Sequence, residues 1–208
     1  MNLEPDPTPG DRQGPHEHAV PLEMALAFVN TLEYERGEPV DHLTSTAIAL
    51  DWLHDHGLTH GRPTGHGDAP LARVRRARGA LRELIDSTVD GRPPATAAVA
   101  EVNRLLRAHE VLELVLDGDG LTLGHRHHGD PVEDALARLA EPLAREVSGD
   151  RRARFRICAN DRCRWAFYDT SRTGVRRWCD MSSCGNRAKA ARHRARARGQ
   201  DVESDRPS

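Results

Sequence analysis

The chain of 208 residues is long enough for one ordinary domain and a small second unit. No stretch approaches the roughly 18 apolar residues needed to span a bilayer. The first thirty residues carry Asp, Glu and Pro, whereas a signal peptide needs a basic start and an apolar run. We therefore expect a cytoplasmic protein without a membrane partner.

The net charge of −2 conceals an unequal distribution of charge along the chain. Residues 1–150 contain 14 Arg against 26 Asp and Glu, a balance of −12, whereas residues 151–198 contain 15 Arg and Lys against 3 Asp, a balance of +12. A positive block of this density attracts polyanions, and nucleic-acid backbones are the commonest of them. A solvated, arginine-rich end of the chain is the alternative interpretation.

The N-terminal part predicts a disordered leader followed by helices. Residues 1–19 are rich in Pro, Gly, Asp and His and lack apolar periodicity, which is typical of disorder. Spacings of three and four residues then predict a first helix, whose inward stripe consists of Leu22, Ala25, Leu26, Val29 and Leu32. A second helix is expected to be capped by Asp41, to pass through Leu43 and Leu53, and to end at Gly57.

Three further helices are predicted over residues 70–89, 94–109 and 131–147, and Val99 is expected to face inward on the middle one. Between the last two, alternating leucines around an Asp-Gly-Asp-Gly turn at residues 117–120 predict a β-hairpin. Residues 20–150 are thus expected to form a mainly helical domain with one small hairpin.

The chemistry-bearing residues of this domain are few. Asn30 and Thr31, polar residues in an apolar helix, are candidates for lining a ligand pocket, although they are also compatible with a helix end. The histidines lack cysteine or carboxylate partners at metal-ligand spacing, so we interpret them as surface residues. These are His42, His54, His56, His60, His66, His109, His125, His127 and His128. Without a phosphate loop, nucleophile elbow or carboxylate pair, the sequence favours a protein that is not an enzyme.

All four cysteines lie in one 27-residue window, as Cys158, Cys163, Cys179 and Cys184, with the spacing C-x4-C, fifteen residues, C-x4-C. Two paired turns joined by a hairpin-sized spacer suit a tetrahedral ion, and four thiolates leave no open position for catalysis. Two disulfides would need an oxidising compartment, and iron is the alternative metal. We expect one structural Zn²⁺ that supplies much of the folding free energy of this small module, so that the metal-free module unfolds.

The last helix is expected to carry the binding surface. Ser182 or Ser183 can cap it, and it should run to about Arg198. A helical wheel places Arg187, Arg194 and Arg198 in one row and Lys189, Arg192 and Arg196 in a second row, with alanines between. Such a helix could lie in a DNA groove and contact phosphates of both strands. Arg172, Arg176 and Arg177 in the spacer would extend this surface, and Asn186 or Arg187 lies where base edges are commonly read.

The run Arg176 to Lys189, which contains Cys179, Asp180 and the Cys184-Gly185-Asn186-Arg187 motif, resembles the CGNR zinc finger. The resemblance extends to Cys158, Cys163, Phe167, Asp169, Ser171 and Arg172. The preceding part is similar to the ABATE domain through residues 28–32, Asp41, Leu43, Trp52 and Leu53. The resemblance covers about residues 20–198. It implies a bacterial transcription regulator, sometimes described as stress-induced, in which the four cysteines hold zinc and Asp180 replaces a more usual serine.

We therefore predict an α+β fold, with a mainly helical N-terminal domain and its small β-hairpin followed by a treble-clef-like or ribbon-type zinc finger that ends in a basic helix. The units are a leader (1–19), an ABATE-like domain (20–150), the finger (151–198) and a disordered tail (199–208). The predicted function is zinc-dependent binding of double-stranded DNA, with a ligand-sensing or assembly role for the N-terminal domain. The alternative is an RNA- or protein-interaction module, whose finger the chain's own acidic domain could mask.

Overall fold

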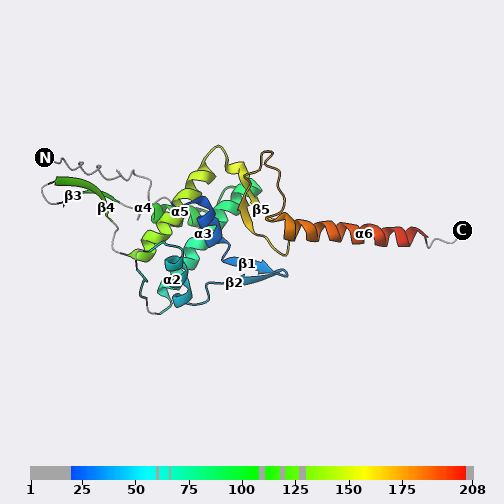
Figure 1. Cartoon of the computed structure of the whole chain (residues 1–208), viewed down its shortest axis with the longest axis horizontal. Coiled ribbons are helices and arrows are strands. Elements are labelled where there is room, and N and C mark those ends of the chain that lie inside the picture. The colour runs from blue at the N-terminus through cyan, green and yellow to red at the C-terminus, as the bar shows by residue number, and fades with distance from the viewer. Residues whose placement is uncertain are drawn as a thin grey trace, which may run out of the picture.

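The computed structural model describes residues 20–59, 61–65, 67–107, 111–117, 120–126 and 130–204. A helical body occupies the centre, one β-hairpin projects at one end, and a long C-terminal helix projects at the other (Figure 1). Among the helices in these ranges, none has both the length and the apolar character needed to cross a membrane. The predicted leader, residues 1–19, and the last four residues of the predicted tail lie outside the described residues.

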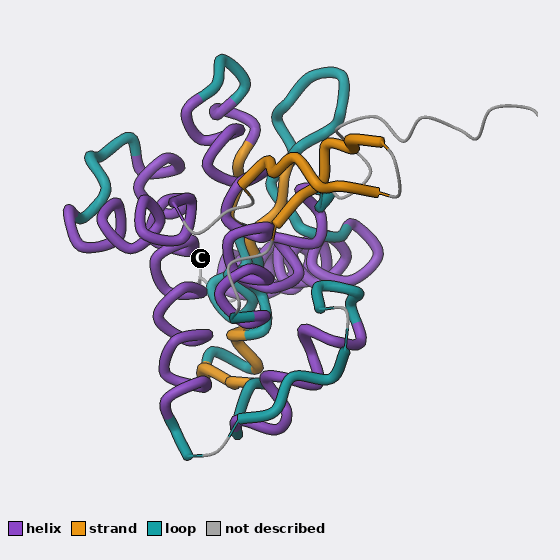
Figure 2. The backbone as a smooth tube through the Cα atoms, turned by 90° about the vertical axis from the view of Figure 1, so that its left-hand side faces the viewer, coloured by secondary structure: helices purple, strands orange, loops and turns teal. Residues whose placement is uncertain are grey.

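Helices form most of the body, and the short strand pairs lie around them (Figure 2). Asp130 caps the last helix of the body because its side chain accepts hydrogen bonds from the backbone N–H groups of Val132 and Glu133. The longest helix, Ala69–Asp90, ends at Gly91, which adopts the left-handed conformation with a φ of 66°. The mainly helical N-terminal part is thus confirmed. Its helices are α1 (Leu22–Val29), α2 (Thr46–Asp55), α3 (Ala69–Asp90), α4 (Thr96–Arg107) and α5 (Pro131–Ser148).

The helix α3 lies at the centre of the core, in contact with α1, α2, α4 and α5. The side chains of Leu81 and Ile85 on α3 and of Leu139 on α5 are fully buried. Val99 was predicted to face inward, but 36% of its surface is exposed because α4 turns the preceding residue, Ala98, to the core. Val102 and Leu105 are buried as the helical spacing predicts, so the expected inward face of α4 is wrong only at Val99.

A hairpin that the sequence analysis missed follows α1. Its strands are β1 (Leu32–Glu35) and β2 (Glu38–Asp41), which pair antiparallel. Arg36 and Gly37 form the turn with φ values of 56° and 98°, as a two-residue turn with both central residues in the left-handed region requires. Leu32 is therefore a strand residue and does not belong to the first helix; its spacing from Val29 merely continues the helical stripe across the break.

Asp41 does not cap α2, contrary to the prediction. Its carboxylate accepts two hydrogen bonds from the buried Arg78 guanidinium, at 2.7 and 2.8 Å, and lies 3.0 Å from Nε of Arg75. The cap of α2 is Ser45, whose hydroxyl accepts a hydrogen bond from the Ile48 N–H group. The side-chain hydrogen bond from Arg78 keeps the pKa of Asp41 below its usual value, so the carboxylate stays ionised. Because Asp41 ends β2 and Arg78 lies on α3, this ion pair joins the hairpin to α3.

The predicted hairpin between α4 and α5 is confirmed. Its strands are β3 (Val111–Asp117) and β4 (Gly120–Arg126), which pair antiparallel, and its turn residues 118 and 119 lie outside the described residues. The hairpin projects away from the helical body (Figure 1). Its leucines Leu114, Leu116 and Leu121 are largely exposed.

The C-terminal part shares the core of the helical body. After a 3-10 turn (Arg152–Arg154), strands β5 (Phe155–Ile157) and β6 (Ala166–Tyr168) pair antiparallel. Phe155 and Ala166 are both 1% exposed and belong to the same buried cluster as the helix side chains. The finger is therefore joined to the N-terminal domain through a common core, which the sequence analysis did not anticipate.

Candidate metal centre and basic helix

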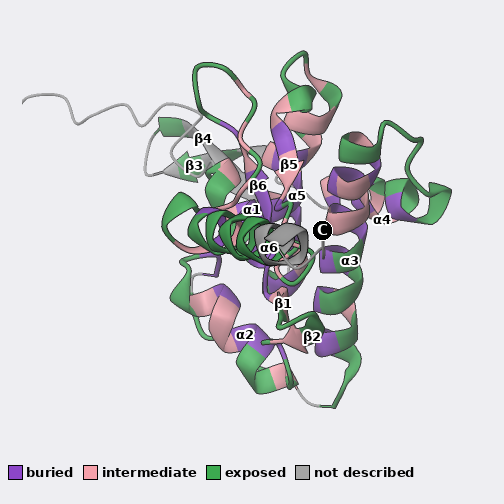
Figure 3. Cartoon of the chain, turned by 90° about the vertical axis from the view of Figure 1, so that its right-hand side faces the viewer, coloured by how far each residue is buried: buried purple, intermediate pink, exposed green. Residues whose placement is uncertain are grey.

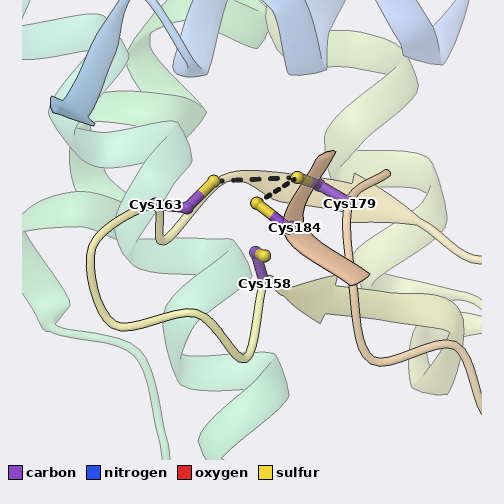
Figure 4. Close-up of side chains that lie close together, drawn as sticks. All are labelled: Cys158, Cys163, Cys179 and Cys184. Carbon is purple, nitrogen blue, oxygen red and sulfur yellow. Dashed lines mark hydrogen bonds between the residues drawn. The ribbon is translucent and has the colours of Figure 1, made fainter. Parts of the chain in front are cut away.

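The four cysteine sulfurs converge on one point (Figure 4), and all of them lie within 4.8 Å of one another. The Sγ of Cys179 is 3.6 Å from that of Cys163 and 3.8 Å from that of Cys184, and none of the four forms a disulfide. A tetrahedral zinc ion with Zn–S bonds of about 2.3 Å places its sulfurs about 3.8 Å apart. The donor set and its spacing therefore fit one structural zinc ion, and the disulfide alternative is excluded.

The first pair of ligands lies on the loop that joins β5 to β6. The Cys158 N–H group donates to the Trp165 carbonyl (2.9 Å), which extends the strand pairing up to the ligand. The Asn160 carbonyl accepts from the Cys163 N–H group (2.8 Å) and closes the turn, and Arg164 follows with a φ of 49°. The Asn160 amide also donates to Sγ of Cys184 at 3.5 Å, so this side chain links the two ligand pairs.

The second pair lies at the start of the C-terminal helix. Cys184 is part of a π-helical turn (Met181–Gly185) that continues directly into α6 (Asn186–Ser204). The cap is Asp180, whose carboxylate accepts hydrogen bonds from the Ser183 N–H group (2.7 Å) and the Ser182 hydroxyl (2.6 Å). The prediction that a serine caps this helix was wrong. Because the last ligand lies in the turn that starts α6, the metal centre fixes the origin of the helix.

Gly185 of the motif lies in a tight contact. A Cβ atom at this position would lie 2.9 Å from Sδ of Met181 and 3.4 Å from the Trp178 ring. A larger residue at this position would require the Met181 side chain to move away from the turn.

Two of the four ligand thiols lie in surroundings that disfavour their ionised form. Burial raises the pKa of both Cys163 and Cys179, and the neighbouring Cys158 sulfur raises it further. A bound zinc ion stabilises the thiolates and reverses this balance, so metal binding and the folding of the two ligand loops are coupled.

Asp169 organises the spacer between the ligand pairs. Its carboxylate, which is 1% exposed, accepts hydrogen bonds from the N–H groups of Ser171 (2.9 Å) and Arg176 (2.8 Å). Burial acts to raise the pKa of this carboxyl group, but the hydrogen bonds outweigh burial and lower it. The loop is thereby held against the end of β6.

Arg176, one of the predicted nucleic-acid contacts, has its guanidinium group engaged within the finger. This group lies 4.9 Å over the Phe167 ring, and it donates to the backbone carbonyls of Trp178 (2.8 Å) and Cys179. The half-buried side chain holds the loop that carries Cys179. These contacts give Arg176 a structural role in the loop that carries Cys179, without a nucleic-acid contact.

The other predicted contact residues lie on the surface. Arg172 and Arg177 are exposed on the spacer, and the Arg177 guanidinium lies 5.4 Å over the Trp178 ring. Figure 3 looks along α6, whose coloured residues are mostly exposed, and the helix continues past Arg198 to Ser204. The predicted residues of this helix are all exposed: Asn186, Arg187, Lys189, Arg192, Arg194, Arg196 and Arg198.

A cavity of about 570 Å³ lies beside the metal centre. Its basic lining comprises Arg36 from the β1–β2 turn, Arg162 from the first ligand loop, and Arg187 and Arg194 from α6. The sequence analysis had not singled out Arg36 or Arg162. The position of Arg162 between two ligands was a usable signal, whereas Arg36 belongs to a segment with an acidic balance and only the tertiary fold brings it here.

Asn30 and Thr31 have polar groups that are used inside the protein. The Asn30 amide donates to the Ala166 carbonyl (2.8 Å) and accepts from the Ala166 N–H group (2.9 Å). Thr31 donates to the Phe28 carbonyl (2.7 Å) and accepts from Arg78 (3.0 Å). Both side chains are buried and do not line the cavity. Their contacts explain their polarity without the predicted ligand pocket.

The histidines show one small group of potential ligands among the described residues. Nε2 of His42 lies 2.6 Å from the Glu33 carboxylate, with the exposed Glu35 nearby. The ring of His56 stacks on Trp52 with a centroid distance of 4.0 Å. Five of the predicted surface histidines lie outside the described residues: His60, His66, His109, His127 and His128.

The fold and the site together define a zinc-finger protein in which a four-cysteine centre carries a basic helix on a mainly helical domain. Residues 22–150 match the ABATE family, described as "Putative stress-induced transcription regulator", and residues 154–197 match the CGNR zinc finger. The chain belongs to the ABATE family and carries a CGNR zinc finger, which confirms the resemblance noted in the sequence. Neither description is that of an enzyme.

The chain is also similar to a protein of Pseudomonas paraeruginosa that bears the name N-(5'-phosphoribosyl)anthranilate isomerase, with 37% identity over 135 residues. The match covers 59% of this chain and 57% of that protein, so the chain spans little more than half the length of this relative. The enzyme name belongs to that protein and carries no activity over to this chain.

Proposed function

We propose that the protein is a cytoplasmic transcription regulator that binds double-stranded DNA through its zinc finger. The observation that supports this function most strongly is the position of α6. The metal centre fixes its first turn, and the rest of the helix extends from the body with its cationic side chains exposed. Many DNA-binding proteins place a basic helix, held at one end by the rest of the domain, in the major groove.

The charge of α6 favours a polyanionic partner. Its cations have no ion-pair partner within the part of the chain that the structure describes. A helix that is polar on all sides gains little from packing, and like charges along it repel one another. Binding to a phosphate backbone relieves this repulsion and releases counterions.

The contacts of α6 do not favour masking by the acidic domain. The helix extends away from the helical body, and its main contacts within the described residues are with the π-helical turn at its own start (Figure 1). On this proposal the N-terminal domain senses a ligand or mediates assembly, and it leaves the finger accessible. Binding to structured RNA is an outcome that the same experiment can detect.

The test is a titration of a fluorescently labelled random duplex with the zinc-loaded full chain, followed by fluorescence anisotropy at several salt concentrations. We expect an affinity that falls steeply with salt, with about 0.9 in the log–log slope for each phosphate contacted. Cys179→Ser should abolish most of the binding, because it removes a zinc ligand. Val175→Ala, at a residue 70% exposed in the spacer, should not change it. Absence of binding at low salt, or tighter binding to a structured RNA competitor, contradicts the proposal.

A further inference from the structure

The β1–β2 turn of the N-terminal domain lies beside the first ligand loop of the finger. A Cβ atom on Gly37 would lie 3.9 Å from Cγ of Arg162, so the turn and the loop lie close together. Next to this contact, the Arg164 guanidinium lies 5.8 Å over the ring of Tyr34 in β1. The Arg164 carbonyl in turn accepts a hydrogen bond from Arg82 of α3 (3.0 Å). Domain and finger thus form a continuous surface at this point.

The cavity beside the metal centre lies on this shared surface. Arg36, Arg162, Arg187 and Arg194 line it, together with one carboxylate, Asp161. In the described ranges, none of the four guanidinium groups has an ion-pair or hydrogen-bond partner. Four unpaired cations and one carboxylate leave this cavity, which we call the basic groove, with an excess of positive charge. Arg guanidinium groups are suited to binding phosphate oxygens.

The two basic rows of α6 are therefore not equivalent. Arg187 and Arg194 belong to one row, and both line the cavity, whereas Lys189, Arg192 and Arg196 of the other row do not. The first row therefore shares the cavity with Arg36 of the β1–β2 turn, whereas the named residues of the second row do not.

We propose that this groove binds the phosphodiester backbone of duplex DNA and that the N-terminal domain contributes Arg36 to it. The inference rests on the proposed DNA-binding function and adds a second source of contacts. The helical domain is then part of the DNA-binding surface, in addition to any sensing or assembly role. The hairpin fixes the backbone position of Arg36 at the cavity, because a two-residue turn on paired strands has little freedom.

The decisive variant is Arg36→Asn in the full-length, zinc-loaded protein. Asparagine tolerates the left-handed φ of 56° at this position and creates the Asn-Gly sequence preferred in such turns, so the hairpin should remain intact. The matched control is Arg62→Asn, since Arg62 is an exposed arginine of the same domain that does not line the cavity. Arg36→Lys keeps the charge and serves as the rescue variant.

We expect Arg36→Asn to weaken binding to a random duplex about 3- to 10-fold near 0.1 M salt and to reduce the log–log salt slope by about 0.9, which corresponds to one phosphate contact. Arg62→Asn should match the parent protein, and Arg36→Lys should recover most of the affinity. Equal effects of Arg36→Asn and Arg62→Asn would indicate a general loss of charge and overturn the inference. The inference would also be overturned if Arg36→Asn bound DNA like the parent protein while Arg192→Ala bound more weakly. That result would leave the proposed DNA binding by α6 intact. Failure of the parent protein to bind DNA overturns both.

Discussion

At the scale of single residues, Asn30 has an unusual importance because it links the two parts of the chain. Its side chain is 3% exposed and pairs with both backbone groups of Ala166, which lies 136 positions away in the sequence. The polarity of Asn30 was visible in the sequence, but its partner is a backbone group in a distant segment. A residue pattern cannot specify such a partner, which is why a pocket was the expectation.

Replacement of Asn30 by alanine should destabilise the protein by about 2 to 4 kcal/mol, because it leaves a buried N–H group and a buried carbonyl of Ala166 without partners. The measurement is urea denaturation of the zinc-loaded protein. Asn103→Ala, at an exposed position of α4, provides the matched control and should change the free energy of unfolding by less than about 0.5 kcal/mol. Equal effects of the two substitutions would show that the Asn30 contacts are not formed.

The ion pair between Asp41 and Arg78 gives the fold a defined pH dependence. The hydrogen bond from Arg78 lowers the pKa of Asp41, so the carboxylate contributes stability above its unfolded pKa of about 3.9, and this contribution is lost as the pH falls through the lower folded value. Asp41→Asn should cost about 2 to 3 kcal/mol at pH 7, because it leaves the charge of Arg78 buried without its counterion.

Denaturation of both proteins between pH 7 and pH 2 measures this linkage. The difference in the free energy of unfolding between the parent protein and Asp41→Asn should shrink as the pH falls from about 3.9, the unfolded pKa, through the lower folded pKa of Asp41. A difference that stays constant over this range would contradict the assignment.

At the scale of elements, helical periodicity predicted the body well, because each helix buries one apolar face and ends at a recognisable residue such as Gly91. The β1–β2 hairpin escaped detection for two physical reasons. Its first residue, Leu32, continues the spacing of the preceding helix, and its Arg-Gly turn places a non-glycine residue at positive φ without the usual asparagine or aspartate signal. The hairpin is also held from outside, by the ion pair between Asp41 and Arg78 of α3.

The finger consists of elements with two different sources of stability. The β5–β6 hairpin inserts Phe155 and Ala166 into the common core, whereas the ligand loops and the start of α6 depend on the metal. Removal of zinc with a chelator should therefore unfold only part of the finger. Hydrogen exchange measured by mass spectrometry should show rapid exchange in residues 179–198 and continued protection in residues 155–157 and 166–168. Loss of protection throughout the finger would favour the original expectation of a module that folds on the metal alone.

At the scale of the whole molecule, the family match divides the chain at about residue 150, but packing does not separate the two parts. The N-terminal domain supplies the core on which β5 and β6 rest, and it also brings Arg36 to the groove beside α6. The sequence predicted the metal ligands because their spacing is local. The composite groove depends on tertiary contacts between distant segments, which no local pattern contains.

Removal and restoration of the metal in one sample tests whether the zinc centre presents α6 to DNA. The anisotropy of a labelled duplex is followed at constant protein concentration and low salt while a chelator and then excess zinc are added. We predict that the duplex is released when zinc is removed and is bound again when zinc is restored. Unchanged binding by protein that elemental analysis shows to be metal-free would mean that α6 binds DNA without the zinc centre.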